Sequence, residues 1–498
     1  MKRILLSVIL LLMLPLAHAQ TGKPRPKLVV TIVVDQFRYD YLTRFRAEYH
    51  GGIARLLDNG AVFVDARYLH YPTVTAIGHS TLMSGATPSV SGIIGNEWYD
   101  RTAKHSVTSV SDEGAHLLGG PEVMGSSPAR LLVSTVGDEL KMAGRESTVI
   151  GISMKDRSAI LPAGHMADAA YWFHSKSGIF VSSDYYMKDL PAWVKAVNEG
   201  QPIAKYKSAV WSGVHAKPGE KPFCAMTEGG GVRPCGAIEN TPFGNELVED
   251  FAEKAIANEH LGEHKGTDVL ALSFSSNDYV GHGLGPDSPE VHDISIRTDQ
   301  LLGKLLDFIK ARLGDGNTLF VFTADHGVAP VPTVNNARKM PGAYLDSADY
   351  ARRISAELAK KFGPGDWFLY SHDGFLYLND ITVDANKADR AEVRRYAAEV
   401  ARGLPHIARA FTREDLLRGN AMADSVGRAI QVGFYTARSG DVFLLPEPYC
   451  FFGAAPGTTH ATPYSYDNHV PLIFYGFGIR KGVHYGPVTI NDVAPTLA

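Results

Sequence analysis

Short apolar runs rich in β-branched residues alternate along the chain with longer stretches of helical periodicity. The runs lack polar alternation, which is typical of strands buried on both faces of a parallel sheet. The clearest helix opens at Ser288 and Pro289, a capping residue followed by a first-turn proline, and stops at Gly314. This alternation predicts a doubly wound α/β fold, with helices on both faces of a mostly parallel central sheet. The predicted strands are Leu28–Val34, Thr148–Ser153, Val269–Phe274, Leu319–Thr323 and Pro471–Tyr475.

Two regions interrupt this alternation. Residues 171–241 are rich in Gly, Pro, Trp and Tyr, and residues 331–456 combine a strand-like run at Trp367–Leu378 with a charged helix near Ala388–Arg402. We expect both to be insertions that cap the ligand-binding edge of the sheet, within one catalytic domain spanning residues 20–498. Residues 492–498 have the pattern of a helix opening that is cut short, as expected of a fragment lacking its final element.

The first 19 residues have the pattern of a signal peptide. Lys2 and Arg3 precede the apolar run Ile4–Leu16, and Ala17-His18-Ala19 supplies a small-x-small cleavage site. The run is short for a bilayer-spanning helix, and no Cys follows it to carry a lipid; an uncleaved anchor is the alternative. We therefore expect cleavage before Gln20 and a periplasmic or secreted monomer without a stable membrane anchor.

Composition and cysteine content refine this picture only slightly. The formal net charge is -4, so no broad basic face predicts a nucleic-acid partner. In an oxidising compartment Cys224 and Cys235 could close a short loop, although all three cysteines could equally remain reduced and packed. Cys450 precedes two phenylalanines, so we expect a buried, inert thiol.

Aspartate and histidine side chains follow several predicted strands, where ligands of open α/β sheets bind. Taken singly, such residues are more often turn formers, helix caps or ordinary surface groups. Together they predict a site for two divalent ions of the zinc type. The candidate ligands are Asp35 after the first strand, Asp278 and His282 after the third, Asp325 and His326 after the fourth, and His460 in the loop before the last.

A threonine-rich segment and three other polar residues are candidates for phosphate chemistry. Thr73 and Thr75 lie just before a predicted helix at Ser80–Ser84, where the helix dipole and a metal ion would activate a hydroxyl as a nucleophile. The alternative is that Thr73 or Thr75 merely caps the helix. Asn96 can donate to an oxyanion or simply occupy a turn.

Lys155 and Arg157 follow the second predicted strand and are two positions apart. On an extended chain they would share a face and could reach one phosphoryl group together. The alternative is an exposed charged turn.

The segments Asp325-His326-Gly327, Asp278-x-x-x-His282 and Gly457-Thr458-Thr459-His460, with the leading Asp35, resemble the metal motifs of the alkaline phosphatase superfamily. The similarity runs from about residue 27 to the end of the chain. It is greatest to the branch that contains the nucleotide pyrophosphatases/phosphodiesterases and the phosphate-irrepressible alkaline phosphatases.

This resemblance implies a ligand set, a nucleophile and an activity. One zinc ion would take Asp278, His282 and His460, in preference to the competing His469. The other would take Asp35, Asp325, His326 and the oxygen of Thr75, the implied nucleophile, whereas His79 would be structural.

The Lys-x-Arg pair resembles that of the monoesterases, whose dianionic substrate offers an extra charged oxygen to two cations. The resemblance therefore implies an exported, zinc-dependent alkaline phosphatase that hydrolyses small-molecule phosphate monoesters through a phosphothreonine. The alternative is a phosphodiesterase or nucleotide pyrophosphatase on the same two-zinc core. A sulfatase, with its Cys/Ser-x-Pro-x-Arg nucleophile segment, and a non-catalytic phosphate- or metal-binding protein are less favoured.

Overall fold

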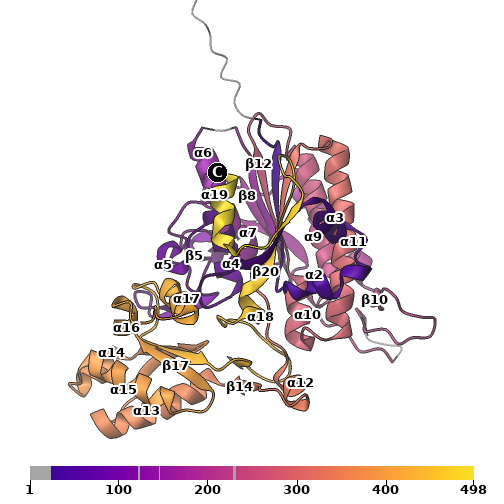
Figure 1. Ribbon diagram of the computed structural model, residues 1–498. Helices are drawn as coiled ribbons and strands as arrows, with labels where there is room; N and C mark the ends of the chain where they lie inside the picture. Colours follow the sequence, from indigo (N-terminus) through magenta and orange to yellow (C-terminus); the bar gives the residue numbers. More distant parts are fainter. Residues whose placement is uncertain (1–23, 122–123, 145, 228–230) are drawn as a thin grey trace, which may run out of the picture.

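A mixed sheet of 12 strands forms the centre of the molecule, and helices cover both of its faces (Figure 1). The computed structural model describes residues 24–121, 124–144, 146–227 and 231–498, so the predicted signal peptide lies outside it. Helices α3 (Gly52–Asn59), α9 (Pro242–Asn258) and α11 (Pro289–Leu313) lie on one face. Helices α4 (Thr75–Ser84), α6 (Val136–Met142), α7 (Asp156–Ala163) and α19 (Val493–Leu497) lie on the other.

Five neighbouring strands at the centre of the sheet are parallel. The middle strand β1 has all seven residues buried, which explains its unbroken apolar sequence. Its end is level with those of its neighbours, since Val34 pairs with Phe274 and Val33 with Thr323. In spatial order the strands are β13 (Thr318–Thr323), β1 (Leu28–Val34), β12 (Asp268–Phe274), β7 (Val149–Ser153) and β8 (Ala169–His174).

Antiparallel pairings flank this parallel centre. On one side β20 (His469–Gly476) runs antiparallel to both β13 and β2 (Ala61–Arg67), so the expectation of a parallel strand at Pro471–Tyr475 was wrong in direction. An apolar run reveals burial on both faces but not direction, and the chain enters β20 from the opposite edge of the sheet. Beyond them lie β21 (Gly482–His484) and β22 (Val488–Thr489), and on the far side β9 (Ile179–Ser183), β5 (Ser111–Leu118) and β6 (Met124–Ser126).

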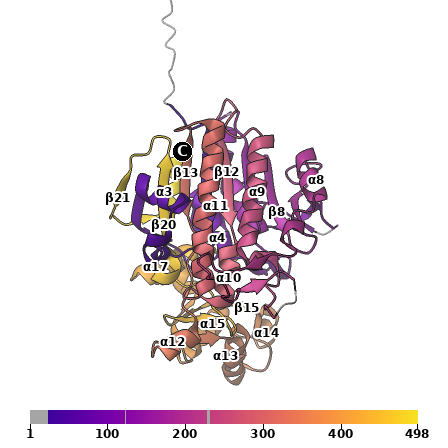
Figure 2. The same ribbon diagram turned by 90° about the vertical axis from the view of Figure 1, so that its right-hand side faces the viewer.

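The predicted helix at Ser288–Gly314 is confirmed as α11. The Ser288 side chain accepts a hydrogen bond from the Val291 amide, and Gly314 ends the helix with a φ of 82°. Asp299 on this helix accepts from the amides of His50, Gly51 and Ala54, which ties α3 to α11. Figure 2 shows α11 and α9 lying side by side across the sheet.

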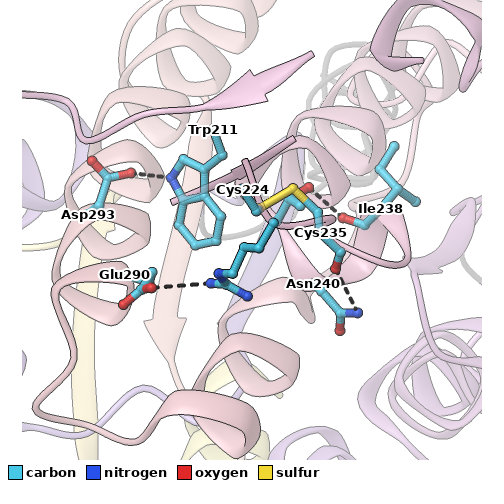
Figure 3. Close-up of a disulfide and its surroundings, with 9 residues drawn as sticks. Trp211, Cys224, Cys235, Ile238, Asn240, Glu290 and Asp293 are labelled. Carbon is cyan, nitrogen blue, oxygen red and sulfur yellow. Dashed lines mark hydrogen bonds and ion pairs between the residues drawn. A yellow bond between two sulfur atoms is a disulfide. The ribbon is translucent and has the colours of Figure 1, made fainter. Parts of the chain in front are cut away.

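Residues 171–241 do not leave the sheet at once. They begin within β8 and include β9, so the irregular segment starts only after Ser183; aromatic residues in β8 obscured its strand character. A disulfide joins Cys224 and Cys235, the pairing that the sequence left open (Figure 3). Beside it the Trp211 indole donates to Asp293 of α11 at 2.6 Å, which holds this segment against the helix.

Residues 331–456 form a second unit with its own apolar core around Trp367, below the carboxyl ends of the central strands in Figure 1. The strand-like run Trp367–Leu378 folds as the hairpin of β15 (Phe368–His372) and β16 (Phe375–Leu378). These strands join β18 (Val442–Pro446) and β17 (Ile407–Thr412) in a four-stranded sheet, beside α13 (Ser347–Phe362) and α15 (Arg390–Arg402). We call this unit the cap. Within the described ranges, the protein contains no helix long and apolar enough to cross a membrane.

Helix α7 packs tightly against the sheet at Gly151 of β7, where an added Cβ would lie 1.9 Å from the carbonyl oxygen of Ala159 in α7. We expect Gly151→Ala to lower the free energy of unfolding by about 3 kcal/mol, because the backbone must shift. Urea denaturation measures this loss. Gly486→Ala is the control, since its Cβ would meet nothing within 4 Å; equal stability of the two variants would contradict the packing argument.

Candidate metal centre and nucleophile

The ligand candidates on β1 and β13 meet at the edge of the sheet. Asp35 directly follows β1, and Asp325 and His326 directly follow β13, its parallel neighbour. All three are buried, and their ligand-type atoms lie within 4.8 Å of one another. The structure thus forms one group of three potential metal ligands from segments that are 290 positions apart.

A second group forms beside the first. Helix α10 (Ser276–Leu284) follows β12 and presents Asp278 and His282 one turn apart, with Nε2 of the histidine 3.1 Å from Oδ1 of the aspartate. His460 comes from the loop before β20 and completes this group, again within 4.8 Å. Its ring stacks on that of His326 at 3.5 Å between centroids, so the two groups are adjacent.

All three histidines are oriented by main-chain carbonyl groups. Nδ1 of His282 lies 2.8 Å from the carbonyl oxygen of Thr458. The corresponding distances are 2.9 Å from Nδ1 of His326 to the Gly327 oxygen and 2.7 Å from Nδ1 of His460 to the Thr73 oxygen. A carbonyl oxygen can only accept, so each Nδ1 carries the proton and each Nε2 keeps a free lone pair. This arrangement is typical of metal-binding histidines.

The carboxylates also fit metal ions. Oδ1 of Asp35 and Oδ2 of Asp325 are buried and have no hydrogen-bond partner among the described residues. Burial and the neighbouring charge of Asp35 raise the pKa of Asp325 well above its usual range. Two facing buried carboxylates can both remain charged only with a cation between them. The mixed nitrogen and oxygen donors suit zinc and related divalent ions.

Lys155 lies between the two groups. Its Nζ donates to Oδ2 of Asp35 and Oδ2 of Asp278, both at 2.6 Å, and its side chain is 3% exposed. Burial alone would lower the pKa of Lys155, but the charges of Asp278 and Asp35 outweigh it and raise that pKa. The alternative interpretation of Lys155 as part of an exposed charged turn is therefore wrong. Its side chain is a charged ammonium group inside the centre.

Arg157 is not on an extended chain with Lys155. Helix α7 begins at Asp156, so Lys155 precedes it and Arg157 lies in its first turn, which contradicts the expected shared face. The Arg157 side chain is 27% exposed, but its Nε is buried without a partner among the described residues. A guanidinium in this position is available to an anion that approaches Lys155.

Thr75 is the first residue of α4. The capping position belongs to Val74 and no side chain caps the helix, so neither threonine has the capping role. Thr75 is 1% exposed, and its hydroxyl lies 3.3 Å from Nε2 of His326. Thr73 instead donates to the carbonyl oxygen of Thr462 at 2.8 Å. Of the two hydroxyl groups, only that of Thr75 is in hydrogen-bond contact with a potential metal ligand.

Asn96 stands over the start of the same helix. Its Oδ1 accepts from the Ala76 amide at 2.9 Å, which leaves its NH2 group to donate elsewhere. This hydrogen bond holds the Asn96 side chain in one orientation beside Thr75.

Two further histidines, His79 and His469, form contacts outside the two ligand groups. His79 lies between the Thr75 carbonyl and the Ser273 hydroxyl, each at 2.9 Å, and burial lowers its pKa to about 4. His469 stacks on Tyr39 and contacts the Val64 carbonyl at 2.9 Å. His469 belongs to neither ligand group, whereas His460 does.

Gln36 was not singled out from the sequence. Its amide donates to Oδ1 of Asp325 at 3.1 Å and its side chain donates to Oδ1 of Asp278 at 2.6 Å, so it connects the two groups. Its φ of 63° is in the left-handed region, which is unusual for a residue other than glycine. No pattern in the sequence distinguishes this glutamine from an ordinary turn residue.

One segment of the chain fits the nucleophile pattern of the sulfatases. Ser126-Ser127-Pro128-Ala129-Arg130 fits the Ser-x-Pro-x-Arg pattern. However, the Ser126 hydroxyl donates to Asp156 at 3.4 Å, and Arg130 binds the Ser111 carbonyl and Asp100. Neither side chain forms a hydrogen bond with a residue of the two ligand groups in the part of the chain that the structure describes, so the segment does not supply the nucleophile here.

The fold, paired ligand groups and threonine define a class of metal-dependent phosphate-ester hydrolases. Residues 29–469 match the family described as type I phosphodiesterase / nucleotide pyrophosphatase. The chain belongs to this family, and its assignment to the alkaline phosphatase superfamily is confirmed.

Three named relatives match nearly the whole chain. The alkaline phosphatase PafA of Elizabethkingia meningoseptica is 34% identical over 100% of this chain and 95% of its own length. The alkaline phosphatase PhoV of Synechococcus elongatus is 34% identical over 95% of this chain and 90% of its own length. A Myroides odoratus protein named calcium-transporting ATPase is 35% identical over 95% and 91%.

The crystal structure of PafA has a TM-score of 0.89 to this chain at 32% identity, covering 96% of both. A PafA variant in which a threonine, an asparagine, a lysine and an arginine are replaced gives a TM-score of 0.88. The predicted α/β fold is confirmed by this similarity.

We expect Gln36→Ala to weaken metal binding by about 10- to 100-fold, as the loss of a residue that orients metal ligands commonly does. Chelator competition against zinc measures the affinity. Gln201→Ala is the matched control, because Gln201 also has a positive φ, of 50°, but is exposed. Unchanged affinity in Gln36→Ala would show that Gln36 does not organise the centre.

Proposed function

We propose that the protein is an exported alkaline phosphatase that hydrolyses phosphate monoesters through Thr75, with two zinc ions per chain. The observation that carries this proposal is the placement of the Thr75 hydroxyl 3.3 Å from His326, at the junction of the two ligand groups. The similarity to PafA and PhoV over nearly the whole chain supports the monoesterase activity. The signal-peptide pattern of residues 1–19 supports export, and we expect a monomer.

Thr75 would act as the nucleophile in the first half of the reaction. Two zinc ions would be held by Asp278, His282 and His460 and by Asp35, Asp325 and His326, and would neutralise the attacking and leaving oxygens. The Thr75 oxygen attacks phosphorus as the bond to the alcohol oxygen breaks, which forms a phosphothreonine and releases the alcohol. Water then attacks the same phosphorus, so phosphate leaves and the threonine hydroxyl is restored.

Three other side chains would bind the transferring group. The free NH2 of Asn96, the ammonium of Lys155 and the guanidinium of Arg157 are donors for its non-bridging oxygens. The PafA variant lends support, since its four replaced residues are of the same types in the same order, with the last two also two positions apart. A monoester presents one more charged oxygen than a diester, so these cations favour the monoester.

Phosphodiester or nucleotide pyrophosphate hydrolysis is the second candidate, because the family description names both. It would use the same metal centre. The cationic pair of Lys155 and Arg157 argues against it as the main activity, since a second ester substituent would face charge rather than apolar surface.

We expect Thr75→Ala to abolish monoester hydrolysis while the metal content stays near two ions per chain, since six other ligands remain. Initial rates and elemental analysis test this, and mass spectrometry of acid-quenched wild-type enzyme should find phosphate on Thr75. Thr73→Ala is the matched control and should retain both turnover and the phosphorylated peptide. Full activity in Thr75→Ala would refute the assignment.

The choice of ester class is tested at Arg157. A lost charge-assisted hydrogen bond costs about 1.5–3 kcal/mol, so Arg157→Ala should lower kcat/KM for an aryl phosphate roughly 10- to 100-fold. The effect on a bis-aryl phosphate should be much smaller. Arg352→Ala, at an exposed site on α13, controls for loss of positive charge. An equal fall for both esters would remove the argument for monoester preference.

A further inference from the structure

A second kind of ligand cluster lies in the cap, outside the catalytic centre. His406 precedes β17, Glu447 follows β18, and Cys450 opens β19 (Cys450–Phe452). The Cys450 sulfur, a ring nitrogen of His406 and a carboxylate oxygen of Glu447 all lie within 4.8 Å of one another. Three donors of different chemistry from three segments therefore converge on one point.

Main-chain hydrogen bonds hold these residues in place. The Glu447 amide donates to the His406 carbonyl at 2.9 Å, and the Cys450 amide donates to the Glu447 carbonyl at 3.0 Å. The Tyr350 hydroxyl donates to the Pro405 carbonyl at 2.7 Å, which fixes the approach to His406. His406 itself has a φ of 58°, in the left-handed region. The donors are thus organised without any ligand.

The cluster is open on one side and closed on the other. The side chains of His406 and Glu447 are 47% and 51% exposed, whereas Cys450 is 1% exposed and forms the floor. His406 Nδ1 and Glu447 Oε2 are 3.2 Å apart. An ion arriving from solvent would meet the imidazole and the carboxylate first and the sulfur below them.

The chemistry of Cys450 fits such an ion. A hydrogen bond from the Ala343 backbone is directed at the Cys450 sulfur. A soft or borderline cation binds thiolate and displaces the proton, and a backbone N–H directed at the sulfur is a common support for that bond.

We propose that His406, Glu447 and Cys450 form a third metal site, specific for zinc or a similar thiophilic divalent ion, which joins β17 to the turn between β18 and β19. A sulfur, nitrogen and oxygen set matches zinc and excludes calcium and magnesium, which require oxygen ligands. The site is chemically distinct from the catalytic centre, whose candidate ligands are all nitrogen and oxygen.

Cobalt substitution separates the two kinds of site. A thiolate bound to Co²⁺ gives an intense near-ultraviolet charge-transfer band, which nitrogen and oxygen ligands do not. The chain has three cysteines, and Cys224 and Cys235 form the disulfide, so only Cys450 can produce this band. The readout is independent of phosphatase activity and of the proposed catalytic ligands.

In the full-length chain, metal-depleted and then saturated with Co²⁺, we expect the band in the wild type and its loss in Cys450→Ser and in His406→Ala. Glu447→Gln should weaken it. Zinc content should be near three ions per wild-type chain and near two in Cys450→Ser and His406→Ala, with ester hydrolysis unchanged. His105→Ala, an exposed histidine paired with Glu113, is the control and should keep the band.

Absence of the band in saturated wild-type protein would overturn the proposal. A band that survives both His406→Ala and Glu447→Gln would also overturn it, since the sulfur would then bind cobalt without these partners. Because His406 and Glu447 are half-exposed, these two variants keep the test valid even if Cys450→Ser fails to fold.

Discussion

Asp35, Asp278 and Asp325 are buried close together at the ends of three neighbouring strands, and a carboxylate in such surroundings is stable only beside positive charge. Lys155 supplies one such charge to Asp35 and Asp278. One oxygen each of Asp35 and Asp325 has no hydrogen-bond partner among the described residues, and these two oxygens mark where further positive charge is required. Two divalent ions would exceed the remaining negative charge, and the centre would then attract a dianion. The charge of the site and its preference for phosphate therefore have the same physical origin.

The main chain, more than any side chain, orients the three histidines of the candidate metal centre. The carbonyl groups of Thr73, Gly327 and Thr458 each accept from one imidazole. Thr73 and Thr458 are distant in sequence from the histidines they contact, whereas Gly327 directly follows His326. A carbonyl oxygen is present whatever residue occupies the position. The side chains at these positions can therefore change without altering how the imidazoles point, provided that the backbone path is kept.

Much of the arrangement could be predicted from the sequence because it depends on strand ends. Apolar runs locate β1, β12 and β13, and parallel neighbours end at the same edge, so Asp35, Asp278 and Asp325 had to meet. Helix periodicity places His282 one turn from Asp278 for a similar reason. These are local patterns whose spatial consequence is fixed by sheet geometry.

Other features depend on contacts that no local pattern records. The direction of β20 depends on where the chain returns from the cap, and the aromatic sequence of β8 hid a sheet strand. The geometry of Arg157 depends on α7 starting one residue after Lys155. Gln36 acquires its role only because Asp278 and Asp325 approach it from distant segments.

The loop that carries His460 is joined to the segment that carries Thr75 through Thr73. The Thr73 oxygen contacts Nδ1 of His460 at 2.7 Å and accepts from the Ala461 amide at 3.2 Å, and the Thr73 hydroxyl donates back to Thr462 at 2.8 Å. The intervening chain includes the whole cap. Because this junction sets the distance between Thr75 and His460, the cap can be enlarged, reduced or exchanged in evolution while these two candidate site residues keep their spacing.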